Sequence, residues 1–240
     1  MEYESKEILK KYGISLPNGQ LVSSTENTRI DCPVMLKAQI PIGGRGKGGG
    51  IIEASSGEEA KAGIERLLSN RVRGYRPKKI LLEEKIDVAQ EFFLAIVYDT
   101  VAKCPVAIFS QEGGVDIEEL ALRQPEKVKK DRFSVRARLP QYRAREIISE
   151  AGVSGRTLLG LGSILSSLGD SFLDYDATLA EINPLALTRD GKLIALDCHM
   201  EIDDDSLFRH KDVAEKQEDQ SRYEGGRSST DFERRAADRL

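Results

Sequence analysis

The chain has 240 residues, of which 40% are hydrophobic and 32% charged, and its formal net charge at pH 7 is −4. This composition is typical of a folded protein and argues against intrinsic disorder. With 36 basic and 40 acidic residues and no run of 18 apolar residues, general attraction to nucleic acid or anionic lipid and a membrane-spanning helix are not expected.

The three cysteines, Cys32, Cys104 and Cys198, are far apart in the chain and form no CxxC motif. They predict reduced thiols and not a disulfide framework or a zinc site. The N-terminal segment is acidic and polar, unlike a signal peptide. We therefore expect a cytoplasmic protein, or one of the mitochondrial matrix if the source is eukaryotic.

Hydrophobic periodicity and turn residues predict an α+β protein. In chain order we expect a helix over 2–12, strands over 33–40 and 51–54, a helix over 57–69, strands over 79–85, 91–98 and 105–110, helices over 115–122, 141–151 and 155–169, and strands over 178–187 and 192–198. The first helix is expected to bury Ile8, Leu9 and Tyr12 and to expose its Lys and Glu residues. Gly169 is expected to end the helix that starts at residue 155, and a weak helix is expected near 230–240.

The densest glycine cluster of the chain, residues 43–50, contains six glycines together with Arg45 and Lys47. Glycine lets the backbone approach a ligand closely, and exposed amides with two cations suit a phosphate group. The cluster is not a P-loop, because Gly48 follows the Gly-Lys pair where Ser or Thr would hold Mg²⁺. It is not a dinucleotide fingerprint either, because it leads into a strand. The alternative is a flexible hairpin tip with solvated charges.

Oxygen-bearing side chains gather on the hairpin predicted near residues 178–198. Glu181 and Asn183 are two residues apart in a strand and so share one face, and Pro184 indicates an edge or a bulge. A three-residue loop with Gly191 in the left-handed conformation would place Asn183 opposite Asp197. Such carboxylate and amide oxygens suit Mg²⁺, and the alternative is a polar row on a half-exposed sheet.

Several motifs, in the same order, resemble the β subunit of succinyl-CoA synthetase (succinate–CoA ligase), an ATP-grasp protein of the ADP- or GDP-forming acyl-CoA ligases. The β-type module of ATP citrate lyase and citryl-CoA synthetase is a close relative of it. The segments that carry the resemblance are 1–6, 43–50, 80–83, 87–91, 111–118, 181–185, 196–197 and 206–209.

The resemblance implies a site for ATP, or GTP, with Mg²⁺. The nucleotide-binding residues that it implies are Lys37, Gly44, Arg45, Gly46, Glu83, Ile86 and Glu91. The metal ligands that it implies are Asn183 and Asp197, supported by Glu181. The residues themselves agree in two respects. Lys37 is a lone charge in an apolar strand, and a buried ammonium group needs an anionic partner. Glu83 ends a hydrophobic strand, where its carboxylate can accept hydrogen bonds from ribose hydroxyls.

The resemblance also implies an architecture and a partner. The nucleotide is expected between a small lobe of residues 17–87, with the glycine cluster as its lid, and a large lobe of residues 1–16 and 88–240. The family's CoA-ligase domain would follow near the end of this sequence, so we expect a truncated chain or a split subunit. No catalytic residue is expected here, because the family carries its phosphohistidine on an α-type CoA-binding subunit, which predicts an αβ hetero-oligomer.

The function expected on this basis is the passage of phosphate between ATP and a histidine of the partner subunit in an ADP-forming acyl-CoA ligase. Succinate is the first choice of acid, and a citrate- or malate-activating enzyme is the alternative. A further alternative is a nucleotide sensor without catalytic activity, and a carboxylate–amine ligase of the ATP-grasp class would lack a reason for the glycine cluster.

A nucleic-acid binder is another alternative, because residues 123–145 are rich in Lys and Arg. Only two aromatic residues, Phe133 and Tyr142, interrupt the basic residues, so stacking platforms for bases are poor. A solvated charged surface is the simpler interpretation, and no nucleic acid or membrane partner is expected.

Overall fold

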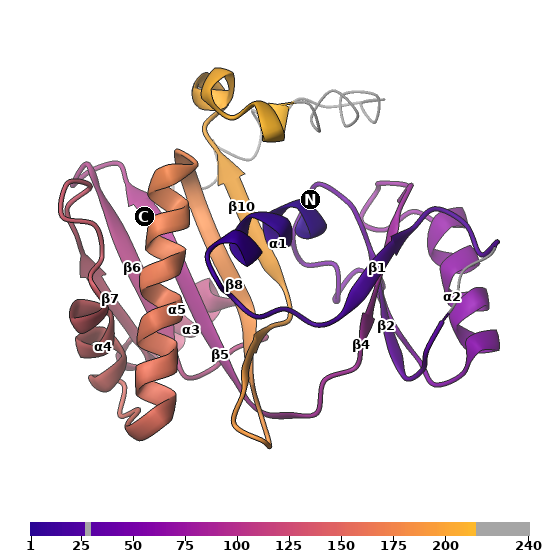
Figure 1. Cartoon of the computed structure of the whole chain (residues 1–240), viewed down its shortest axis with the longest axis horizontal. Helices are drawn as coiled ribbons and strands as arrows, with labels where there is room; N and C mark the ends of the chain where they lie inside the picture. Colours follow the sequence, from indigo (N-terminus) through magenta and orange to yellow (C-terminus); the bar gives the residue numbers. More distant parts are fainter. Residues whose placement is uncertain (27–29, 215–240) are drawn as a thin grey trace. The chain divides into compact units, whose positions relative to one another are not determined.

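The computed structural model describes residues 1–26 and 30–214 (Figure 1). The chain divides into two units, Met1–Glu201 and Ile202–Leu240. The helix expected near 230–240 lies outside the described residues. Within the described ranges, no helix is both long and apolar enough to cross a membrane.

The first sheet of the larger unit has four strands in the order β1-β4-β2-β3 and is antiparallel throughout. Its strands are β1 (Gly19–Val22), β2 (Val34–Ala38), β3 (Ile51–Ala54) and β4 (Ile80–Glu84). Helix α2 (Gly57–Ser69) packs on it, beginning where the Ser56 side chain accepts a hydrogen bond from Glu59 N. Ala60, Ile64 and Leu67 of α2 are buried at helical spacing, and this stripe closes a core with Leu36.

The second sheet has six strands, with β10-β8-β5-β6-β7 in order and β9 also paired to β8. Its strands are β5 (Val88–Asp99), β6 (Cys104–Ser110), β7 (Val128–Arg132), β8 (Ala177–Thr188), β9 (Leu193–Ala195) and β10 (Cys198–Ile202). The apolar faces of β5, β6 and β8 form a separate core that holds Phe92, Phe109 and Ile182.

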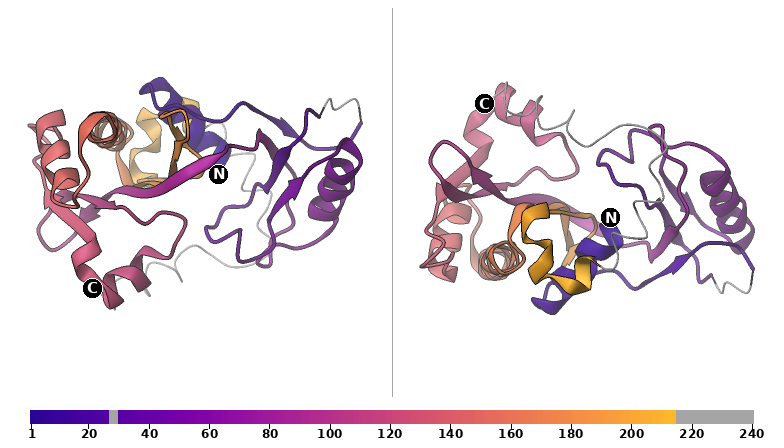
Figure 2. Two further views of the ribbon diagram at one scale, coloured as in Figure 1. Left: turned by 90° about the horizontal axis from the view of Figure 1, so that it is seen from below. Right: turned by 90° about the horizontal axis from the view of Figure 1, so that it is seen from above.

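Helices cover this second sheet, and their bounds are α1 (Glu2–Lys11), α3 (Ile117–Arg123), α4 (Gln141–Ser149) and α5 (Gly155–Asp174). Helix α5 packs on β8 and β5, while α4 packs on β6 and β7. Figure 2 shows α3 on the opposite side of the sheet from α5. A short 3₁₀ helix, Pro125–Lys127, follows α3, and another, Asp204–Arg209, belongs to the smaller unit.

The predicted hairpin register is confirmed. Gly191 has φ +84°, and Thr188 N donates to Lys192 O at 2.9 Å. The same register continues to Asn183 N, which donates to Asp197 O at 3.0 Å. Pro184 lies at a bulge of β8, where the register of the pairing with β5 shifts. Of the two predicted settings for this proline, a bulge or an edge strand, the structure shows the bulge.

Three expectations about elements were wrong or incomplete. Strands β1 and β7 were not predicted. Strand β7 lies at the edge of its sheet and is rich in charged residues, and its alternation of buried and exposed side chains is weak. The single strand expected over 192–198 is interrupted between β9 and β10. Helix α5 continues through Gly169 to Asp174, because that glycine is a packing position: a Cβ there would lie 3.2 Å from Leu139 Cβ.

The expectation that α1 exposes its Lys and Glu residues was also wrong for two of them. Glu2 and Lys6 are each only 4% exposed and lie on the buried stripe with Ser5 and Leu9. This spacing of three and four residues is one face of a helix. The N-terminal helix therefore brings two charges into the interior.

The core of the second sheet depends on the apolar stripe of α5. Leu165→Ala, at a fully buried position, is expected to lower the free energy of unfolding by about 2–5 kcal/mol, because it leaves a cavity. Leu159→Ala, at a position of the same helix that is 52% exposed, should change it by less than about 0.5 kcal/mol. Urea denaturation of both variants measures the difference, and equal effects would contradict this account of the core.

Candidate functional site

Six charged side chains meet in one cluster of the larger unit. Three are acidic and three are basic, and they come from α1, β2, the glycine loop of residues 43–50, β4 and the segment before β10. We refer to them as the charged cluster, and its members are Glu2, Lys6, Lys37, Arg45, Glu83 and Asp197. Five of them are at most 6% exposed, and the side chain of Asp197 is 30% exposed.

Lys6 and Lys37 share the carboxylate of Glu83. Lys6 Nζ donates to Glu83 Oε1 at 2.5 Å, and Lys37 Nζ donates to Glu83 Oε2 at 2.6 Å. Both ammonium groups also donate to the carbonyl of Leu196, at 2.7 and 2.5 Å. The anionic partner expected for Lys37 is therefore present within the protein itself.

Glu2 lies against all three cations of the charged cluster. Its Oε1 is 2.8 Å from Lys6 Nζ and 3.2 Å from Lys37 Nζ. Its Oε2 accepts from Arg45 Nη1 at 2.5 Å and from Gln39 Nε2 at 3.2 Å. Both carboxylate oxygens are thus used, and Glu2 links the lysine pair to the glycine loop.

Arg45 connects the glycine loop to the hairpin. Its Nη2 donates to both carboxylate oxygens of Asp197, at 2.6 and 2.7 Å, while Nη1 binds Glu2 and the carbonyl of Ala38. The loop turns tightly around this residue, because Gly50 N donates to Arg45 O at 2.9 Å. A Cβ at Gly50 would lie 2.7 Å from Val72 Cγ1, so this close approach requires glycine.

Two other predicted site residues, Asn183 and Glu91, lie around a second segment, residues 113–115. Asn183 Oδ1 accepts from Gly114 N at 2.7 Å, and Asn183 Nδ2 donates to Val115 O at 3.1 Å. Glu91 is half-buried beside the same segment, since Gly113 N donates to its carbonyl and a Cβ on Gly114 would lie 2.5 Å from its Oε2.

The structure brings together four of the predicted site residues, namely Lys37, Arg45, Glu83 and Asp197. Asn183 reaches Asp197 through a backbone hydrogen bond. Gly44 and Gly46 are exposed in the glycine loop, and Ile86 is half-buried in the connection between β4 and β5. Sequence reasoning missed Glu2, Lys6 and Gln39; the signal for the first two was their i,i+4 spacing on the stripe of Leu9.

The surroundings shift the pKa values of Glu2, Lys37 and Arg45 in the direction that favours the ionised form, whereas they raise the pKa of Asp197. Burial would raise the pKa of Glu2, but the charges of Lys37, Lys6 and Arg45 together hold it well below its usual range. Burial would lower the pKa of Lys37, but Glu2, Glu83 and Asp197 raise it above its usual range. Desolvation and the nearby Glu2 raise the pKa of Asp197, against the influence of Arg45.

The residues proposed to hold Mg²⁺ have suitable chemistry. Asp197 and Asn183 offer hard oxygen ligands, and Mg²⁺ commonly takes only one or two carboxylates with waters and phosphate oxygens. Glu181 lies nearby, and desolvation raises the pKa of its carboxyl group. In the described ranges no group of three or more His, Cys, Asp or Glu could hold a metal alone. The donors would therefore suit a metal that keeps further ligands of its own, and in this structure Asp197 binds Arg45.

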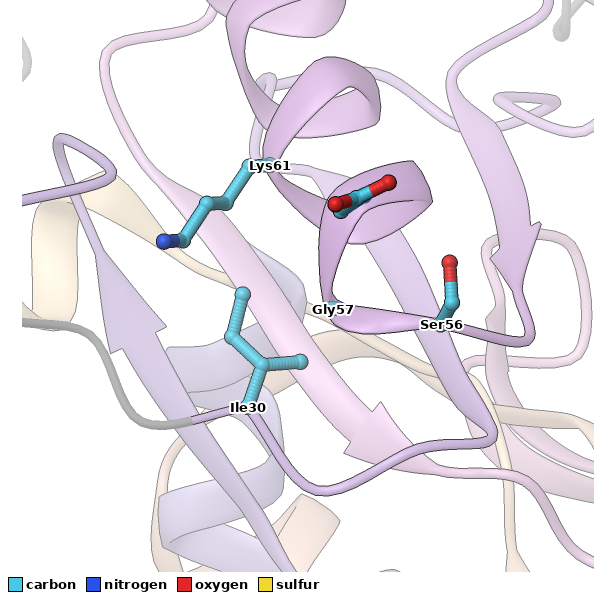
Figure 3. A pocket seen from close by; sticks show the side chains of 5 residues that line it. Ile30, Ser56, Gly57 and Lys61 are labelled. Carbon is cyan, nitrogen blue, oxygen red and sulfur yellow. The ribbon is translucent and has the colours of Figure 1, made fainter.

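The side chains of the charged cluster are bound to one another. Figure 3 shows a pocket elsewhere, at the start of α2. Its lining residues are Ile30, Ser56, Gly57, Glu58 and Lys61. None of them is a predicted site residue, so this pocket does not mark the site.

Comparisons with known proteins agree with this architecture. A family model described as "ATP-grasp domain" matches residues 1–187, and the chain belongs to this family. The expected fold is thereby confirmed.

Curated relatives are β subunits of succinate–CoA ligases, as the sequence motifs suggested. The ADP-forming β subunit of Methanocaldococcus jannaschii is 44% identical over 212 residues, which are 87% of this chain and 58% of that protein. The GDP-forming β subunit of Thermus thermophilus is 37% identical over 222 residues, or 90% of this chain and 58% of that protein. The chain thus spans somewhat less than two thirds of the length of these relatives.

Solved structures support the fold. The dinucleotide forming acetyl-coenzyme A synthetase 1 of Ca. Korarchaeum cryptofilum, in complex with coenzyme A and Mg-AMPPCP, has a TM-score of 0.64 at 20% identity and covers 85% of this chain and 92% of its own. ATP citrate lyase of Methanothrix soehngenii has a TM-score of 0.59 at 20% identity and covers 86% of this chain and 51% of its own.

Glu2 should contribute stability that depends on pH. Because its folded-state pKa is lowered, its contribution is complete above the usual glutamate range and is lost as pH falls and the unfolded chain takes up the proton. Glu2→Gln is expected to cost about 3–5 kcal/mol near neutral pH and less in acid. Urea denaturation over a pH series measures this difference. Glu7→Gln, at an exposed position of α1, is the control, and a difference independent of pH would contradict the assignment.

Proposed function

We propose that this chain is the nucleotide-binding part of an ADP- or GDP-forming acyl-CoA ligase of the succinate–CoA ligase type. The observation that carries the proposal is the charged cluster, in which Arg45 binds the carboxylate of Asp197 and Lys37 binds the carbonyl of the preceding residue, Leu196. Two cations and a carboxylate from separate segments suit the phosphates and the metal of one Mg-nucleotide. Relatives at 44% and 37% identity that carry the β-subunit name support the same function.

In this proposal the chain's own residues position the phosphates. Lys37 and Arg45 donate charge-assisted hydrogen bonds to phosphate oxygens, with Gly44 and Gly46 leaving the loop backbone accessible. Arg45 then exchanges Asp197 for phosphate, and Asp197 and Asn183, supported by Glu181, hold Mg²⁺. When bound, the metal neutralises charge on the phosphates, which is much of what phosphoryl transfer requires.

The nucleoside is assigned to Glu83 of β4, to Ile86 in the connection that follows, and to Glu91 of β5. Ile86 and Glu91 would line the base and the ribose. Glu83 would also line the base and the ribose, and its carboxylate orients Lys37 through their 2.6 Å hydrogen bond. The proposed small lobe, 17–87, would hold the four-stranded sheet, and the proposed large lobe, 1–16 with 88–240, would hold the six-stranded sheet.

The proposed partner is an α-type CoA-binding subunit whose histidine receives the phosphate, in an αβ hetero-oligomer. Support comes from the β-subunit names of the relatives and from the phosphohistidine segment named for the acetyl-coenzyme A synthetase. Succinate is the proposed acid. Citrate is the alternative that the fold similarity to ATP citrate lyase favours. The proposed location is the cytoplasm or the mitochondrial matrix, in keeping with three unpaired thiols.

Binding of a Mg-nucleotide tests the proposed function directly. Titration calorimetry with ATP, ADP, GTP and GDP, each with Mg²⁺, is expected to show binding of at least one adenine or guanine nucleotide. Thermal unfolding should shift upward with the same nucleotide, because the ligand stabilises the folded state. The absence of both heat and a thermal shift with all four would contradict the proposal.

Asp197→Asn distinguishes the contribution of the metal to binding from that of the nucleotide alone. The variant removes a proposed metal ligand and also frees Arg45 from a carboxylate. Mg-nucleotide binding is expected to weaken about 10–100-fold, whereas metal-free nucleotide binding should not weaken. Calorimetry with and without Mg²⁺ measures both, with Arg45→Ala expected to weaken both. Asp190→Asn, on the exposed tip of the same hairpin, is the control. Equal losses in Asp197→Asn would mark Asp197 as purely structural.

A further inference from the structure

We infer that Glu2 is a specificity-determining residue of the proposed nucleotide site. Its buried carboxylate offsets the charge of Lys37 and Arg45, so that the site takes the Mg²⁺ complex of a nucleotide and discriminates against the metal-free polyanion. The inference rests on the proposed function and adds to it a residue that makes no contact with the metal.

The position of Glu2 supports this role. Within the described residues it is the acid that touches all three cations of the charged cluster, at 2.8 Å for Lys6, 3.2 Å for Lys37 and 2.5 Å for Arg45. It is 4% exposed, so water screens its charge poorly. Gln39 holds its second oxygen at 3.2 Å, and α1 carries it on a rigid element.

The charge balance of the cluster gives the direction of the effect. Three carboxylates and three cations leave no net charge, so the site does not attract an anion simply because it is positive. The Mg²⁺ complex of a nucleotide carries two fewer negative charges than the metal-free form. A carboxylate near the phosphates therefore repels the metal-free form more strongly, since Coulomb energy scales with the charge of the ligand.

The other two acidic residues of the cluster, Asp197 and Glu83, have different proposed roles. Asp197 is a proposed metal ligand, and Glu83 holds both lysines. Glu2→Gln therefore makes the cluster positive without removing a metal ligand. A merely structural loss would weaken binding of both forms of the nucleotide alike, whereas a loss of charge changes the ratio between them.

The test is the ratio of two dissociation constants for ADP (or for GDP, if the parent chain binds GDP more tightly). One is measured by calorimetry in excess EDTA and the other in excess magnesium chloride, on the full chain with any tag at its C-terminus. The ratio of the metal-free to the Mg²⁺ value is expected to fall about tenfold in Glu2→Gln. In Glu7→Gln, which removes the same charge from the exposed face of α1, it should stay as in the parent.

Lys6 provides a rescue within the same cluster. Lys6→Gln alone makes the cluster negative and should raise the ratio. Combined with Glu2→Gln, it restores the balance of charges and should return the ratio toward the parent value, which a structural role of Glu2 would not do. If Glu2→Gln does not fold, the double variant compared with Lys6→Gln measures the same effect of Glu2.

The two possible failures can be told apart. If the parent chain binds neither form of the nucleotide, the proposed function fails and this inference fails with it. If the parent binds Mg-nucleotide and Arg45→Ala weakens that binding, but removal of Glu2 leaves the ratio within about twofold, only the role of Glu2 is overturned.

Discussion

Buried charge must be compensated, and this requirement organises the centre of the larger unit. Moving an ion from water into protein costs several kcal/mol unless a partner of opposite charge is held at hydrogen-bond distance. Glu2, Lys6, Lys37, Arg45 and Glu83 are all nearly inaccessible, and each is bound to at least one opposite charge. The helix, the two strands and the loop that carry them are thereby held to a common point.

This compensation changes how a ligand would enter. The carboxylates of the cluster already bind the cations that are proposed to hold phosphate. In the proposed function, binding would be an exchange of partners, in which Arg45 would bind phosphate in place of Asp197 and Asp197 would be free to hold Mg²⁺. Each half of the exchange alone leaves a charge without its partner, which is a physical reason for metal and nucleotide to bind together.

The hairpin of β8 and β9 contributes the other half of the site through local geometry. Gly191 sets the loop, the loop sets the register, and the register brings the backbone of Asn183 to that of Asp197. The bulge at Pro184 interrupts the pairing with β5, next to the point where Asn183 binds the backbone of Gly114 and Val115. The side chain of Asn183, a proposed metal ligand, is thus positioned at an irregularity of the sheet.

The sequence by itself determined the features that depend on neighbours along the chain. Turn residues and the alternation of apolar and polar residues were sufficient to predict the register of the hairpin, most helices and strands, and the position of the glycine loop. The ordered motifs were sufficient to predict the family. Only the tertiary structure decided which charges meet. Arg45 and Asp197 are 152 residues apart, Lys6 and Glu83 are 77 apart, and periodicity carries no information about such pairs. Contacts between distant segments also override local preference in two other places. Gly169 lies inside α5 because it packs against Leu139, and β7 forms a strand because it pairs with β6.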